Sequence, residues 1–150
     1  LVRSRGLGDV YKRQGMRLVM TIAASVSLIL LVFKTPLAQL YAENSAVQRY
    51  AETLIILAAI CHLLDAMQCL LYSSLRAWRI TSEPMLVYGV SLWGLGVGGG
   101  FFLATEIFAP DAGAARGFWI GNFFGLLFAC IGLWLLLRRR FVNPVLTIKP

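Results

Sequence analysis

Four long apolar runs constrain the fold of this chain more than any other feature. They cover about residues 18–40, 47–75, 85–105 and 115–137, and a helix of about 20 apolar residues crosses the roughly 30 Å hydrocarbon core of a bilayer. Only 14% of the residues are charged, whereas a soluble domain carries about 25%. We therefore expect an all-α integral membrane segment with four transmembrane helices over residues 15–140.

The two ends of the chain differ from the apolar runs in composition. Residues 1–14 are polar and basic and lack helical apolar periodicity, and their string SRGLGDVYKRQ resembles translated sequencing-adapter sequence. We expect a non-native or disordered extension there, with a genuine cytoplasmic loop as the alternative. Residues 141–150 are expected to form a polar cytoplasmic tail.

The basic residues predict the orientation of the four spans. The net charge is +7, but the basic residues lie at the ends of the apolar runs and are not interleaved with aromatics as in a nucleic-acid-binding surface. One side has Arg17, Arg76, Arg79, Arg138, Arg139, Arg140 and Lys149, and the other has Lys34, Arg49 and Arg116 together with Glu43, Glu106 and Asp111. The positive-inside rule therefore predicts that both termini are cytoplasmic.

Asp65 is the residue that most requires an explanation, because it lies inside the second apolar run. A carboxylate at the centre of a membrane helix costs about 2.5–3.5 kcal/mol on insertion scales. Two interpretations are open: a structural carboxylate that Gln68 or a neighbouring helix satisfies, or an ion or substrate site that faces a watery cavity. We favour the second, with Asp65 as the cation-binding or proton-coupling residue and His62, Gln68 and Tyr72 as supporting residues.

The other reactive residues do not predict enzyme chemistry. A metal site would use four residues of one helix, namely Cys61, His62, Asp65 and Cys69. One straight helix cannot surround a tetrahedral ion with four ligands. The single histidine has no positioned nucleophile, and three cysteines within apolar runs do not suggest a disulfide framework. We therefore predict no enzyme, no metal site and no cofactor.

Two groups of glycines predict close packing of helices. The glycines of residues 93–100, WGLGVGGG, match the spacing G-x-G-x-x-G, but the strand and βαβ setting that a nucleotide site needs are missing. We interpret them as permitting close helix approach or a kink. Gly117, Gly121 and Gly125 repeat every four residues, so they form one stripe on which another helix backbone can pack.

Three ordered motifs point to a known family. The run LDAMQCLLYSSLRAWRITSEPML is similar to F-D-x-x-Q followed by A-L-R-G-x-G-x-T-x-x-P-M, and its matching residues are Asp65, Gln68, Leu75, Arg76, Thr81, Pro84 and Met85. PLAQLYAENSAV upstream and GFWIGNFFGL downstream carry two further motifs. Together they resemble the multidrug and toxic compound extrusion (MATE) transporters over about residues 15–140. The chain departs from that pattern at Cys61, Ala77, Arg79 and Gly96, where the family has a tyrosine, two loop glycines and a proline.

The resemblance implies the last four helices of a twelve-helix, two-lobe antiporter, within its C-terminal lobe. Such transporters exchange drugs or organic cations for Na⁺ or H⁺ by alternating access, and Asp65 matches an acid that contributes to cation binding in some subgroups. The implied partners are membrane lipid, the missing N-terminal helices, and cationic or amphipathic small molecules, but not nucleic acid. The implied location is a bacterial inner (plasma) membrane, as a multi-pass protein.

Other functions remain open at the level of the sequence. A small four-helix transporter that dimerises would also need only four spans, although such proteins tend to carry their essential acid in the first helix, where this chain has none. A membrane scaffold or subunit would pair Asp65 with a charge of its partner. A membrane oxidoreductase that uses Cys61 and Cys69 is the most distant alternative.

Overall fold

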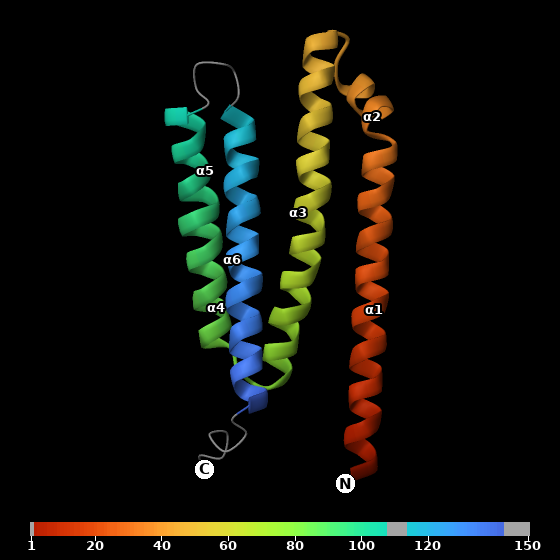
Figure 1. Cartoon of the computed structure of the whole chain (residues 1–150), viewed down its shortest axis with the longest axis vertical. Helices are drawn as coiled ribbons and strands as arrows, with labels where there is room; N and C mark the ends of the chain where they lie inside the picture. The colour runs from red at the N-terminus through yellow and green to blue at the C-terminus, as the bar shows by residue number, and fades with distance from the viewer. Residues whose placement is uncertain (1, 108–113, 143–150) are drawn as a thin grey trace. The chain divides into compact units, whose positions relative to one another are not determined.

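The computed structural model describes the backbone of residues 2–107 and 114–142 and the side chains of residues 14–107 and 114–139. Its described elements are all helical (Figure 1). The chain divides into two compact units, residues 1–66 and 67–150, and helix α3 (Ser45–Ala77) continues from the first into the second. Of the tail predicted at 141–150, residues 143–150 lie outside the described residues.

Four helices have the length and apolar composition needed to cross a membrane. They are Gln14–Val32, Ser45–Ala77, Ser82–Ile107 and Ala114–Arg139. The predicted all-α class with four membrane-spanning helices is confirmed.

The first unit begins with α1 (Val2–Val32), which is followed after one residue by α2 (Lys34–Tyr41). The interruption, at Phe33, lies three residues before Pro36, whose ring nitrogen cannot donate to the carbonyl of Val32. The segment 2–14, expected to be an extension, is drawn as the first part of α1. Whether it is native stays a prediction.

Small side chains bring α1 and α3 together within the first unit. Ser27 of α1 is buried and its hydroxyl donates a 2.9 Å hydrogen bond to the carbonyl of Ala59 of α3, which is also buried. Ala23, one turn before Ser27, is buried as well. Small residues permit this close approach, and the bond satisfies a hydroxyl that has no water in a bilayer core.

The start of α3 is capped by Asn44. The side-chain oxygen of Asn44 accepts a 2.8 Å hydrogen bond from the backbone N–H of Ala46, and its carbonyl accepts from the N–H of Gln48 at 2.9 Å. This is the N-cap arrangement that satisfies the first unpaired donors of a helix.

In the second unit, a four-residue turn joins α3 to the span Ser82–Ile107. This span contains α4 (Ser82–Gly89), the π-helix η1 (Val90–Gly98), α5 (Gly99–Phe102) and the π-helix η2 (Leu103–Ile107). It begins three residues before the predicted residue 85, because Pro84 is tolerated in the first turn, where its missing N–H is not needed. The two π-helical segments were not predicted.

Helix α6 (Ala114–Val142) lies antiparallel beside this span (Figure 1). A Cβ atom built on Gly117 would lie 2.6 Å from the backbone nitrogen of Ala104, and one on Gly125 would lie 2.8 Å from the Cα of Gly96. A Cβ on Gly121 would collide with the backbone of Gly100. The stripe predicted for helix packing therefore faces the backbone of η1, α5 and η2 at a distance that no side chain would permit.

Candidate functional site

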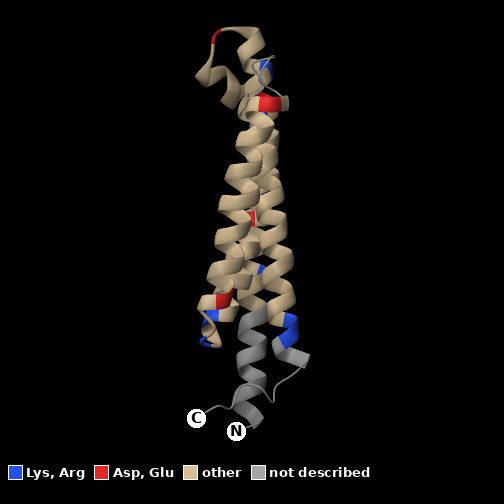
Figure 2. Ribbon diagram, turned by 90° about the vertical axis from the view of Figure 1, so that its left-hand side faces the viewer, with Lys and Arg blue, Asp and Glu red and all other residues tan. Residues whose placement is uncertain are grey.

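Charge is scarce in the middle of the described helices. In Figure 2, most of the ribbon coloured for Lys, Arg, Asp and Glu lies toward the ends of the helices. Asp65 lies in the middle of α3, 20 residues after its start and 12 residues before its end. Arg76, near the end of α3, is 11 residues further on, or about 16 Å along the axis, which is half the thickness of a hydrocarbon core.

The Asp65 side chain is exposed on α3. Within the described part of the chain, its carboxylate forms no hydrogen bond or ion pair. The choice between a structural carboxylate, satisfied by Gln68 or a neighbouring helix, and an ion or substrate site therefore stays a prediction. An unpaired carboxylate in hydrocarbon is costly, so Asp65 needs a partner there.

The three supporting residues have different environments on α3. His62 and Tyr72 are half-buried, whereas Gln68 is buried with only 6% of its surface exposed. The helical spacing places them near the Asp65 side of α3. In the described part of the chain, none of these three side chains forms a hydrogen bond with Asp65.

Tyr72 belongs to an aromatic and cationic group that the sequence analysis missed. Its ring centroid lies 6.2 Å from that of Tyr88 of α4, at an interplanar angle of 56°, and the guanidinium of Arg76 lies 6.0 Å from the Tyr72 centroid. The spacing of four residues between Tyr72 and Arg76 could have predicted their contact. Tyr88 could not have been found in this way, since it lies on the next span.

The metal-ligating residue types do not come together in the described chain. No group of three or more His, Cys, Asp or Glu side chains is close enough there to hold a metal ion. Cys61 and Cys130 are buried and Cys69 is exposed, and the described structure contains no disulfide between them.

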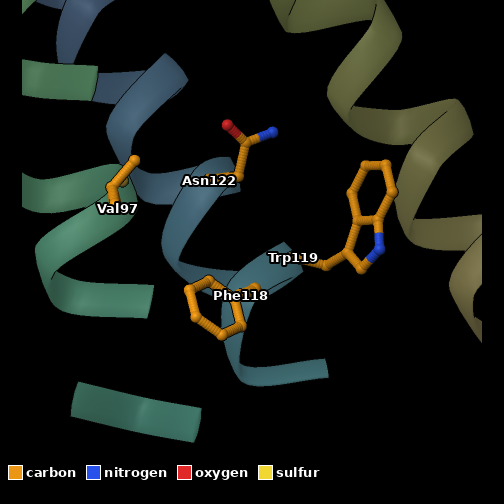
Figure 3. Close-up of a pocket in the computed structure, with 5 residues that line it drawn as sticks. Val97, Phe118, Trp119 and Asn122 are labelled. Atoms are coloured by element: carbon orange, nitrogen blue, oxygen red, sulfur yellow. The ribbon is translucent and has the colours of Figure 1, made fainter. Parts of the chain in front are cut away.

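A pocket of about 250 Å³ lies between η1 and α6 in the second unit. Its lining residues are Gly96, Val97, Phe118, Trp119 and Asn122. In Figure 3, Val97 projects from η1, and Phe118, Trp119 and Asn122 project from α6. The lining is mainly apolar and aromatic, with the Asn122 amide as its polar side chain. The glycines of this region predicted only a packing surface, and the pocket was not predicted.

The sequence is similar to a family of membrane transporters. The MatE family profile matches residues 7–102, which contain the first two of the three motifs and end before α6. The match includes residues 7–14, part of the segment that we expected to be an extension.

Curated relatives extend the similarity over most of the chain. The probable multidrug resistance protein NorM of Aromatoleum aromaticum is 30% identical over 129 residues, which are 84% of this chain and 27% of that protein. NorM of Idiomarina loihiensis is 39% identical over 103 residues, or 69% of this chain and 22% of that protein. Multidrug resistance protein MdtK of Pectobacterium atrosepticum is 30% identical over 130 residues, which are 86% of this chain and 28% of that protein. The chain spans less than a third of the length of these relatives.

Proposed function

We propose that this chain, which belongs to the MatE family, forms the last four helices of a multidrug efflux antiporter that is driven by Na⁺ or H⁺. Its relatives are named multidrug resistance proteins, and the chain corresponds to between 22% and 28% of the three compared above. Four membrane-spanning helices fit a part of the C-terminal lobe of a two-lobe transporter. Alternating access requires both lobes, so transport belongs to the longer protein. The proposed role is transport, without enzyme chemistry or a cofactor.

The observation that carries the proposal is the exposed carboxylate of Asp65 in the middle of α3. We expect it to face the interior of the complete transporter, where helices absent from this chain enclose it. A bound Na⁺ or a proton would offset the cost of placing the carboxylate there. Release of that ion would restore a negative charge that attracts a cationic drug. One residue would thereby couple the ion to the exported molecule.

The distribution of arginines supports an orientation with both termini in the cytoplasm. In this proposal the protein lies in a bacterial inner (plasma) membrane and exports cationic or amphipathic small molecules. Its other partners are membrane lipid and the N-terminal helices of the same transporter. The coupling ion is a transported substrate and not a resident cofactor.

Asp65→Asn in the full-length transporter tests this role. The amide has nearly the same shape as the carboxylate but cannot bind a cation by charge or take up a proton. We expect ion-driven efflux of a fluorescent organic cation from loaded cells to fall to the level of cells without the transporter, with normal insertion into the membrane.

Glu52→Gln is the matched control, since it removes a carboxylate from the first turns of the same helix. Efflux by this variant should remain close to that of the parent. If Asp65→Asn transports normally at equal abundance in the membrane, Asp65 does not couple the ion, and the scaffold or subunit interpretation gains support.

A further inference from the structure

Four arginines lie at one end of the second unit. Arg76 lies near the end of α3, Arg79 lies in the turn that follows, and Arg138 and Arg139 belong to the end of α6. All four side chains are exposed. Among the described residues, Glu83 in the first turn of α4 is the acidic residue nearest to Arg79 in sequence. We call this set the arginine cluster.

Packing between α4 and α6 places the two halves of the cluster at the same level. A Cβ atom on Gly132 of α6 would lie 2.6 Å from the Cγ1 of Val87 of α4. From this contact, Arg138 is six residues further along α6, about 9 Å, and Ser82 is five residues back along α4, about 8 Å. Because the two helices are antiparallel, both paths lead toward the same end of the unit. Arg79 comes three residues before Ser82, in the turn at this same end of the unit.

Two exposed tryptophans accompany the arginines. Trp78 lies between Arg76 and Arg79 in sequence and is 44% exposed, and Trp134 is 49% exposed. The Arg138 guanidinium lies 5.4 Å from the ring centroid of Trp134. Tryptophan side chains prefer the level of lipid headgroups, where an apolar ring meets water. The arginines therefore lie where the membrane-spanning helices leave the hydrocarbon.

We propose that the arginine cluster binds the phosphate of an anionic phospholipid headgroup. Guanidinium groups recognise phosphate through paired N–H donors as well as through charge. Basic groups between helix ends at the cytoplasmic face are suited to such headgroups. The apolar surface of α4 and α6 begins directly beside the cluster, with exposed Met85 and Leu86 on α4, so that it accommodates acyl chains. A soluble polyanion would leave this surface uncovered.

The test uses tryptophan fluorescence of the full 150-residue chain in micelles. Trp93 and Trp119 are replaced by phenylalanine, which leaves Trp78 and Trp134, the two tryptophans beside the cluster, as reporters. Phosphatidylglycerol or phosphatidylcholine with brominated acyl chains is titrated, since bromine quenches indole at contact. We expect half-maximal quenching at a concentration of phosphatidylglycerol at least about tenfold below that of phosphatidylcholine, as expected for several arginines that each contribute about fivefold.

Arg79→Gln with Arg138→Gln should raise the phosphatidylglycerol concentration for half-maximal quenching by about tenfold to thirtyfold. Arg79→Lys with Arg138→Lys should retain most of the preference, because the charge remains. Lys34→Gln with Arg49→Gln is the matched control, because it removes the same charge from the first unit, and it should leave the preference unchanged. Equal quenching by the two lipids, or an unchanged preference in the Arg79→Gln and Arg138→Gln variant, would overturn the proposal.

Discussion

Arg79 holds a backbone conformation that favours glycine. Its φ angle is 60°, in the left-handed region, which costs a residue with a Cβ roughly 1–2 kcal/mol. The N–H of Ile80 donates to the carbonyl of Leu75 at 3.2 Å, and the N–H of Arg79 donates to the carbonyl of Arg76 at 2.9 Å. These two bonds form a Schellman motif, in which the left-handed position is usually glycine. The turn after α3 therefore keeps its geometry despite an unfavourable residue.

Arg79→Gly should raise the free energy of unfolding by about 1 kcal/mol, because the left-handed conformation no longer strains a Cβ. Unfolding of the chain by a denaturing detergent, followed by far-UV circular dichroism in micelles without anionic lipid, measures the change. Ala77→Gly is the control, since Ala77 is the last helical residue of α3. This replacement should lower the free energy of unfolding by about 0.5–1 kcal/mol. A loss of stability in Arg79→Gly would show that the side chain contributes more than its backbone costs.

The sequence predicted some properties of individual residues and not others. Asp65 could be identified from the sequence, because a carboxylate within a long apolar run has a high free-energy cost in a bilayer. The exposure of its side chain could not be predicted, since it depends on the rotation of α3 about its own axis. The left-handed backbone of Arg79 has no signal in the arginine itself. Only the resemblance gave a signal, because the R-G-x-G pattern has a glycine at the position of Arg79.

At the level of the helices, spacing predicted one packing surface but not its partner. The four-residue repeat of Gly117, Gly121 and Gly125 identified a smooth stripe on α6. In the glycine-rich span, however, a Cβ on Gly94 would meet nothing within 4 Å, whereas Gly96 and Gly100 lie against α6. A run of glycines has no periodicity that could distinguish these positions. The π-helical segments η1 and η2 change the phase of the helix further.

Gly121→Ala should destabilise the packing of α6 against η1 and α5 by about 1–3 kcal/mol. The new methyl group would meet the backbone of Gly100 and lie 2.7 Å from the carbonyl oxygen of Gly96. Backbone atoms cannot rotate away as a side chain can, so the helices would have to separate. The midpoint of detergent unfolding measures this loss.

Gly94→Ala is the matched control for Gly121→Ala, because its methyl group would point into open space. Its stability should be unchanged or higher by up to about 1 kcal/mol, since alanine favours the helix over glycine. Equal effects of the two replacements would contradict the packing shown by the structure and would point to the general cost of altering a glycine-rich span.

For the whole chain, the number of spans was the most predictable property. A bilayer requires long apolar runs in which every backbone group is paired, so the runs themselves define the helices. The ends of the helices were less predictable. Arg138 and Arg139 continue α6, where cations favour the C-terminal end of a helix dipole. The pocket beside Asn122 was missed because it depends on how η1 and α6 fit together.

The orientation of the spans remains a prediction, and cysteine labelling can test it. Cys61, Cys69 and Cys130 are first replaced by alanine, and a single cysteine is then placed by Glu43→Cys or by Ser82→Cys, both at exposed positions outside or at the ends of helices. The excess of arginines near Ser82 predicts a cytoplasmic location for that turn, whereas the turn at Glu43 should face the other side. In intact bacterial cells, an impermeant maleimide should therefore label the Glu43→Cys chain and not the Ser82→Cys chain. Both should react after the membrane is opened, which controls for access. Labelling of Ser82→Cys alone in intact cells would reverse the orientation and place the arginine cluster outside the cytoplasm.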